Sequence, residues 1–555
     1  MGWLSRATLA SSILAAVACG GGSSDAPADG SGPPPSGGPT SPTDGTPKPG
    51  DGNGDTPVIG TFPKGFLFGT AIAGFQVDMG CPTISADSCE DKNSDWYQWI
   101  TTPRIEDNAL LFMSKDPPSK GPGFYELYEK DLDLAAGKGE AQLGNGAVRL
   151  SIEWSRIFPK ATWNASSHAS LTAIASADGI AFYHRLFAAM KKRGLKPFVT
   201  VNHYTLPLWI HDGNACNQGL DDCIAAGKGG WADPNRARIV NEIAKYAAFV
   251  AEEYGGEVDT WATLNEPFSA VVIAGYIASS FMRSNPPGLT AAWMRVDAAK
   301  TATTAMIEAH ARIYDAIHAY DHADADGDGK NAEVGIVYPY SEIVQTDPSA
   351  DGKTAADNAQ YFFHDMFMDA ACGGVLDENW DRKTVARSDL ANRCDFVGVN
   401  YYFRFPAKPG GFIGSVSSAL VSPLLTFDML ATFDANPKGI TAALKRASKY
   451  GKPLYVSETG TTQDDEPRGA AWTVQTLSLV RQAIRDGLDI RGYFTWSLMD
   501  NYEWNSGTNM RFGLYQVDPT TKARALRDAG EAYATMSKTR DVPAALEQKY
   551  ADYFK

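Results

Sequence analysis

Eight short apolar segments alternate along this chain with segments of helical periodicity. Apolar residues at 180, 183, 187 and 190, and again from 239 to 254, recur every three or four positions, which is typical of amphipathic helices. The expected strands are residues 66–76, 148–154, 196–203, 258–265, 334–340, 395–402, 453–458 and 492–498. Eight strands that alternate with helices predict an α/β protein built as a single (β/α)8 TIM barrel with long βα loops.

The alternative fold is a doubly wound open sheet. It is disfavoured because no strand is followed by the glycine-rich loop and helix that bind a nucleotide in such folds. Long loops are expected at residues 78–122 and 403–435. The second loop is either a packed surface insertion or a wall of the binding site.

The N-terminal segment has the pattern of an export signal. Arg6 precedes an apolar run, residues 7–18, which is too short to span a bilayer. The run Ala16-Val17-Ala18-Cys19-Gly20 resembles a bacterial lipobox, in which Cys19 is lipidated after cleavage. The alternative is an ordinary secretory signal with an incidental cysteine.

Residues 20–57 consist mostly of Gly, Ser, Pro, Thr and Asp, a composition typical of a flexible, disordered linker. We therefore expect a lipoprotein signal peptide at 1–18, a lipid-anchored linker at 19–57 and a catalytic barrel at 58–555. The protein would be an exported bacterial lipoprotein of the periplasm or cell surface. Gly20 lacks the acidic character that favours inner-membrane retention, which favours the outer membrane.

Charge limits the partners. The chain has 50 Lys and Arg against 65 Asp and Glu, a formal net charge of −15. Such a surface repels phosphate backbones, so nucleic acid is not an expected partner. Contact with a membrane is expected only through the N-terminal lipid.

Six cysteines remain once Cys19 is set aside, and they form three close pairs along the sequence. In an oxidising compartment this favours sequential disulfides, although other pairings of the six are open. The candidates are Cys81, Cys89, Cys216, Cys223, Cys372 and Cys394.

Two glutamates stand at the ends of expected strands. Glu266 ends the fourth strand in Asn-Glu-Pro, and Glu458 ends the seventh in Ser-Glu-Thr. A single glutamate at a strand end is more often a surface or ion-paired residue. In a barrel, however, side chains at the C-terminal strand ends meet in the active site, and two opposed carboxyl groups are what glycoside hydrolysis requires.

Several motifs then resemble one family. Phe66-Leu67-Phe68-Gly69, Gly74-Phe75-Gln76-Val77-Asp78, Asp95-Trp96-Tyr97-Gln98-Trp99 and Glu153-Trp154-Ser155-Arg156 occur in the order found in glycoside hydrolase family 1. The resemblance spans about residues 62–527 and is closest to the archaeal-type β-glycosidases. It implies a retaining, exo-acting β-glycosidase.

The resemblance also implies roles for residues at the reacting centre. Glu266 matches the general acid/base and Glu458 the nucleophile, supported by Tyr402 and Arg149. Asn265 matches the group that binds the sugar 2-hydroxyl. The family usually has Asn after the nucleophile, where this chain has Thr459, so the local hydrogen bonding is expected to differ.

Five further residues match the groups that hold the glycone, the sugar to be released. They are Gln76, His203, Trp496, Glu503 and Trp504. The Glu503 carboxylate accepts hydrogen bonds from free 4- and 6-hydroxyls but repels a phosphate. An unphosphorylated glycone is therefore expected. Trp209 matches no motif and is expected to be core or cleft wall.

Charge considerations favour the same division of roles. Arg149 and the Tyr402 hydroxyl stabilise an ionised carboxylate, so Glu458 is expected to be charged. Glu266 must hold a proton in the free enzyme and release it later, which the neighbouring Glu458 charge favours. No metal or organic cofactor is required by this chemistry.

One acidic turn imitates a calcium loop. Asp324, Asp326 and Asp328 match its first ligand positions, but the twelfth is Gly335 where an EF-hand has glutamate. A solvated acidic turn is the favoured interpretation, and a structural Ca²⁺ site is the alternative.

The expected substrates are small β-glycosides or oligosaccharides. A β-glucosidase is favoured, with β-galactosidase and β-fucosidase activity as open alternatives. Two rival functions are a non-catalytic sugar-binding lipoprotein and a transglycosidase or deglycosylase of plant-type glycosides. For residues 403–435, the functional alternative to a packed surface insertion is a wall of the site for the aglycone, the leaving group.

Overall fold

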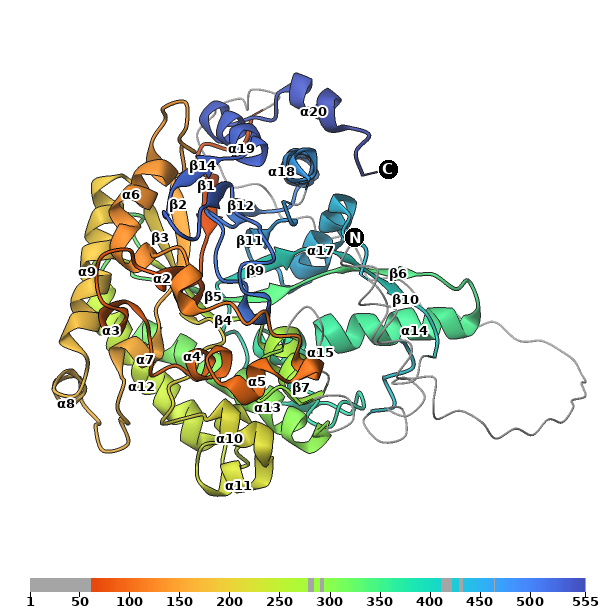
Figure 1. Cartoon of the computed structure of the whole chain (residues 1–555). Helices are drawn as coiled ribbons and strands as arrows, with labels where there is room; N and C mark the ends of the chain where they lie inside the picture. The colour runs from red at the N-terminus through yellow and green to blue at the C-terminus, as the bar shows by residue number, and fades with distance from the viewer. Residues whose placement is uncertain are drawn as a thin grey trace, which may run out of the picture. The chain divides into compact units, whose positions relative to one another are not determined.

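The computed structural model describes residues 61–277, 284–289, 294–410, 422–428, 433–463 and 465–554. Its centre is a closed barrel of eight parallel strands in the order β1-β12-β11-β9-β5-β4-β3-β2 (Figure 1). The strands are β1 (Leu67–Ala71), β2 (Ala147–Ser151), β3 (Lys196–Asn202), β4 (Thr260–Asn265), β5 (Glu333–Pro339), β9 (Phe396–Tyr401), β11 (Leu454–Thr459) and β12 (Ile490–Trp496). The predicted TIM barrel is confirmed.

One strand prediction is wrong in its extent. The first strand was expected over residues 66–76, but β1 ends at Ala71 and the chain turns into helix α2 (Gly74–Asp78). The turn requires Gly74, because a Cβ there would lie 2.9 Å from Oε1 of Glu153. Gln76 consequently projects from a helix and not from the barrel wall.

The barrel interior is filled by side chains that alternate along each strand. Phe198 of β3 occupies its centre and makes edge-to-face contacts with Phe396, Tyr455 and Phe494 from three other strands. Gly69 of β1 leaves the space that Phe494 fills, since a Cβ at position 69 would lie 2.5 Å from that ring. The interior is therefore a packed core, and the site must lie above it at the strand ends.

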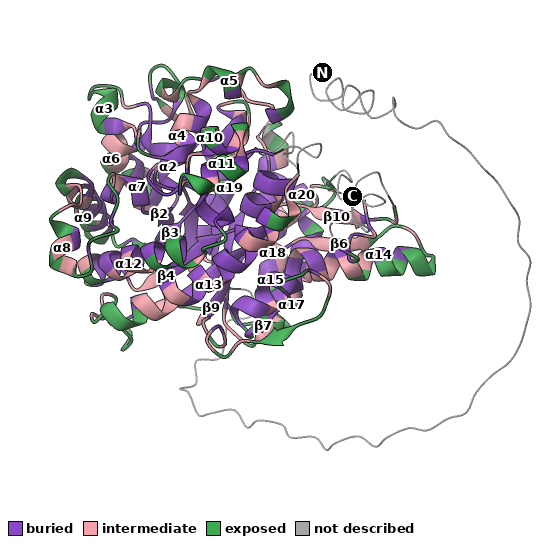
Figure 2. Ribbon diagram, turned by 90° about the horizontal axis from the view of Figure 1, so that it is seen from below, coloured by how far each residue is buried: buried purple, intermediate pink, exposed green. Residues whose placement is uncertain are grey.

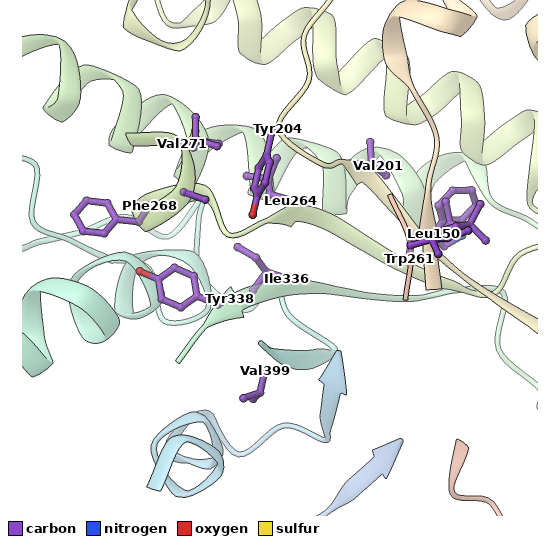
Figure 3. Packing of buried hydrophobic residues seen from close by; sticks show 14 of the residues in the cluster. Leu150, Val201, Tyr204, Trp261, Leu264, Phe268, Val271, Ile336, Tyr338 and Val399 are labelled. Carbon is purple, nitrogen blue, oxygen red and sulfur yellow. The ribbon is translucent and has the colours of Figure 1, made fainter. Parts of the chain in front are cut away.

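The opposite faces of the strands pack against the surrounding helices. Figure 3 shows this layer, in which Leu150, Val201, Trp261 and Ile336 are almost completely buried. The covering helices include α6 (Phe124–Ala136), α9 (Ala177–Lys192), α12 (Ala237–Tyr254), α13 (Val296–Tyr320), α18 (Glu466–Arg485) and α19 (Asp528–Thr539). Their exposed faces form the outer surface, while the strands are buried except for a few residues, most of them near strand ends (Figure 2).

The βα loops contain additional elements. After β5, strand β6 (Glu342–Gln345) pairs in parallel with β10 (Arg404–Ala407), and α14 (Ala350–Gln360) lies beside this two-stranded sheet (Figure 1). The first part of the expected 403–435 insertion thus pairs with β6. Residues 411–421 and 429–432 of the insertion lie outside the described residues.

The six barrel cysteines form the three sequential disulfides that the sequence favoured. They are Cys81–Cys89, Cys216–Cys223 and Cys372–Cys394. The first two close short loops at the C-terminal end of the barrel. The expected signal peptide and linker lie outside the described residues, among which no helix is long and apolar enough to cross a membrane.

Candidate active site

The two glutamates that end β4 and β11 lie at the same end of the barrel. Glu458 is the next-to-last residue of β11, and Glu266 follows β4, where its N–H donates to the Val337 carbonyl of β5 at 3.0 Å. Their exposed fractions are 3% and 6%. Glu266 also acts electrostatically on Glu458, so the two carboxyl groups share one buried environment.

Glu458 is held by two donors from other strands. The Arg149 guanidinium of β2 forms an ion pair with its Oε1, and the Tyr402 hydroxyl donates to its Oε2 at 2.6 Å. Arg149 also donates to Oδ1 of Asn265 at 2.8 Å. A single guanidinium therefore links Glu458 to the residue that precedes Glu266.

Opposing influences act on the pKa of Glu458. Burial raises the pKa of its carboxyl group, Arg149 lowers it, and the Glu266 charge raises it again. The net direction is upward, so the support from Arg149 and Tyr402 does not fully offset desolvation. Glu458 therefore tends to retain a proton above the pH at which an exposed carboxyl loses its own.

Glu266 has two partners to which the sequence reasoning assigned no role. The Tyr204 hydroxyl donates to its Oε2 at 2.8 Å, and Nδ2 of Asn400 donates to its Oε1 at 2.9 Å. Tyr204 directly follows His203, and Asn400 lies two residues before Tyr402. Their position beside predicted site residues was the available signal, but neither side chain is diagnostic by itself.

A second group of polar side chains surrounds the space beside the glutamates. Glu503 accepts hydrogen bonds from Nε1 of Trp496 at 2.8 Å and from Nε2 of Gln76 at 3.1 Å. The His203 ring stacks between those of Trp496 and Trp504, each at 6.0 Å between centroids. All five predicted glycone-binding residues are thus brought together.

Gln76 provides a direct indication of a polar ligand. Its side chain is fully buried and its Nε2 donates within the protein, but its Oε1 has no hydrogen-bond partner among the described residues. A buried acceptor without a donor is costly. A ligand hydroxyl at this position would remove that cost.

Contacts of Asp500 hold the segment that contains Glu503 in place. Asp500 forms a buried, bidentate ion pair with Arg527, with both N···O distances at 2.8 Å. Asp500 also accepts the backbone N–H of Gly513 at 3.1 Å. These contacts fix both ends of the loop that follows β12.

Behind Gln76 lies a buried acidic cluster, which we define as Asp78, Asp91, Glu153 and Arg156. Arg156 pairs with Asp78 at 3.2 Å, while Glu153 accepts the hydroxyl of Thr205 at 2.6 Å. Burial raises the pKa of Asp78 to about 7 and that of Glu153 to about 7, and it also raises the pKa of Asp91. One guanidinium thus faces three carboxyl groups.

The acidic turn before β5 departs from the expected calcium set. The carboxylates of Asp324 and Asp326 cluster with that of Asp259, and Asp328 is not part of this cluster. Asp324 accepts the backbone N–H groups of residues 327, 328 and 329, and Lys196 pairs with Asp326. These donors satisfy the oxygens as a solvated turn would, and calcium binding stays a prediction.

Trp209 belongs to the core. Its exposed fraction is 9%, and its Nε1 donates to the Phe158 carbonyl at 2.8 Å.

Comparison with known proteins places this geometry in context. The sequence model of glycosyl hydrolase family 1 matches residues 58–542. A β-galactosidase of Pyrococcus woesei is 34% identical over 511 residues, which cover 84% of this chain and 95% of that protein. The solved β-glycosidase of Thermosphaera aggregans superposes with a TM-score of 0.72 at 29% identity, covering 88% and 99% of the two chains. A β-glucosidase of Pyrococcus furiosus gives a TM-score of 0.70 at 29% identity, covering 89% and 98%.

The acidic cluster makes stability depend on pH. Because folding raises the pKa values of Asp78 and Glu153 to about 7, the folded protein binds more protons than the unfolded chain from about pH 4 to 7. The free energy of unfolding should therefore fall as pH rises through this window. Glu153→Gln should reduce the fall between pH 5 and pH 8 by about 2–3 kcal/mol, measured by urea unfolding at both values.

The exposed Glu140→Gln serves as the matched control and should leave the pH dependence unchanged. If Glu153→Gln loses stability as steeply as the parent protein, Glu153 does not retain its proton in the folded state.

Proposed function

The chain belongs to glycosyl hydrolase family 1 and is a β-glycosidase, and on this basis we propose that Glu458 and Glu266 perform its double displacement. The observation on which this rests is the Arg149 contact that joins the two glutamate-bearing strand ends in one buried network. Retention of configuration is general for the family.

In the first step, the Glu458 carboxylate attacks the anomeric carbon as the bond to the leaving oxygen breaks. Glu266 transfers its proton to that oxygen, and a covalent glycosyl-enzyme forms. In the second step, Glu266 accepts a proton from water, the water oxygen attacks the anomeric carbon, and Glu458 departs. Two inversions restore the β-configuration, and the carboxyl groups are expected to lie about 5–5.5 Å apart.

The residues around Glu503 support a terminal, unphosphorylated glycone. Glu503 and the free Oε1 of Gln76 offer acceptors to sugar hydroxyls, and Trp496 offers a flat apolar surface for a pyranose ring. These groups suit an exo-acting enzyme that prefers β-glucosides and also accepts β-galactosides or β-fucosides.

The proposed location is the bacterial cell envelope, with the barrel tethered by a lipid on Cys19. The support is the sequence around Cys19 and three disulfides, which are typical of proteins in oxidising compartments.

Replacement of each glutamate should separate their roles. Glu458→Gly should abolish release of nitrophenol from 4-nitrophenyl β-D-glucoside, and added azide should yield the α-glycosyl azide by single displacement. Glu266→Ala should lose about 10²–10⁴-fold on phenyl glycosides, and azide should yield the β-glycosyl azide from the glycosyl-enzyme. Proton NMR of the azide products distinguishes the two.

Glu140→Ala is the control for a surface glutamate and should behave as the parent enzyme. Interchanged azide products, or undiminished turnover in Glu458→Gly, would contradict the assignment.

The preference for a free 6-hydroxyl should depend on the charge of Glu503. Glu503→Gln keeps the shape but weakens the hydrogen bonds to sugar hydroxyls, so kcat/KM for the β-glucoside should fall about 10–100-fold. The parent enzyme should reject the corresponding 6-phosphoglucoside, and the variant should gain measurable kcat/KM on it because the repulsion is removed. An unchanged ratio of the two kcat/KM values would show that Glu503 does not set this preference.

The lipid anchor is testable in a bacterial host. The parent protein should incorporate labelled palmitate and sediment with membranes, whereas Cys19→Ser should do neither. Equal labelling of both proteins would contradict the assignment of Cys19.

A further inference from the structure

We propose that Tyr204 is a positioning residue for Glu266, which keeps that carboxylate in the ionised, base-competent state during the second step of the reaction. The inference rests on the proposed function of Glu266. Tyr204 is 4% exposed and belongs to the buried cluster drawn in Figure 3. Its hydroxyl donates to Oε2 of Glu266 at 2.8 Å and accepts from Nδ2 of Asn265 at 3.0 Å.

The direction of the Tyr204 hydrogen bond follows from its neighbours. A guanidinium can only donate, so the Arg149 contact at 2.8 Å fixes Oδ1 of Asn265 toward Arg149. Nδ2 of Asn265 must then face Tyr204, and an amide nitrogen can only donate. The phenol proton is therefore directed at Glu266. The resulting series of hydrogen bonds runs from Glu458 through Arg149, Asn265 and Tyr204 to Glu266.

The backbone around Glu266 is arranged in an unusual way. Tyr204, Glu266 and Trp504 have positive φ values of 75°, 43° and 46°, which are uncommon for residues other than glycine. Tyr204 contacts both of the others. Its ring centroid lies 4.8 Å from that of Trp504, and its hydroxyl donates to Glu266. Backbone strain persists only where the surroundings impose it, and it is concentrated at functional sites.

The chemical effect of this contact is specific to one half of the reaction. Tyr204 and Asn400 both donate to Glu266, and such bonds stabilise its ionised form. In the free enzyme, the nearby Glu458 carboxylate repels a second negative charge in the same buried environment. Glycosylation of Glu458 removes that charge. The two donors then favour the carboxylate that must deprotonate water.

Tyr204→Phe removes the hydroxyl and keeps the ring. The alkaline limb of the kcat/KM profile, where the acid loses its proton, should move to higher pH by about one unit. With 2,4-dinitrophenyl β-D-glucoside, for which the second step limits turnover, kcat should fall about tenfold. Azide needs no base and should restore the lost rate.

Incorporation of 3-fluorotyrosine at position 204 provides a change of opposite sign. Fluorine makes the phenol a stronger donor, so the alkaline limb should move to lower pH while the fold is retained. Tyr246→Phe is the matched control, since that buried hydroxyl donates to the Ile152 carbonyl at 2.9 Å, away from the glutamates. The control should leave the pH profile unchanged.

Superimposable pH profiles for the parent, Tyr204→Phe and fluorotyrosine proteins would overturn the inference. Failure of the proposed acid/base role of Glu266 would give a different result. In that case Glu266→Ala would give no β-glycosyl azide, whatever the behaviour of Tyr204.

Discussion

The ion pair between Arg149 and Glu458 is the interaction on which the site depends. Both side chains are almost completely buried, and a buried charge without a partner is strongly destabilising. Arg149 projects from β2 and Glu458 from β11, so closure of the barrel is what brings them together. The same guanidinium orients Asn265 at the end of β4. The fold and the catalytic geometry are therefore stabilised by one contact.

The sequence determined the barrel well because its signals are periodic and repeated. Apolar strands alternate with amphipathic helices eight times. The repeated pattern therefore predicts the barrel even where the bounds of one element are predicted wrongly. The first strand shows the limit of this reasoning, because Phe75 and Val77 continue an apolar alternation although they lie on helix α2. The close approach of Gly74 to Glu153 at this turn joins residues far apart in the sequence and has no local signature.

The site was predictable where residue type and position combine in a motif, as for Glu266, Glu458 and the group around Glu503. Tyr204 and Asn400 were missed because their roles depend on where a hydroxyl and an amide point, which only the folded chain decides. The upward direction of the Glu458 pKa was missed for a related reason. The sequence reveals its partners, Arg149 and Tyr402, but not the extent of its burial, which is the largest influence on its pKa.

Buried carboxyl groups outnumber the guanidiniums beside them in this part of the protein. Glu266, Glu458 and Glu503 surround the proposed glycone space, with Arg149 against Glu458. The acidic cluster behind Gln76 contains three carboxyl groups and the Arg156 guanidinium. Arg156 does not fully offset the burial of its carboxyl neighbours, since the pKa values of Asp78 and Glu153 are raised. Glu503 and Gln76 offer acceptors that sugar hydroxyls can satisfy. Substrate binding would supply donors to Glu503 and Gln76, and glycosylation would neutralise Glu458. In the proposed reaction, each step toward the glycosyl-enzyme would therefore relieve part of this unfavourable charge.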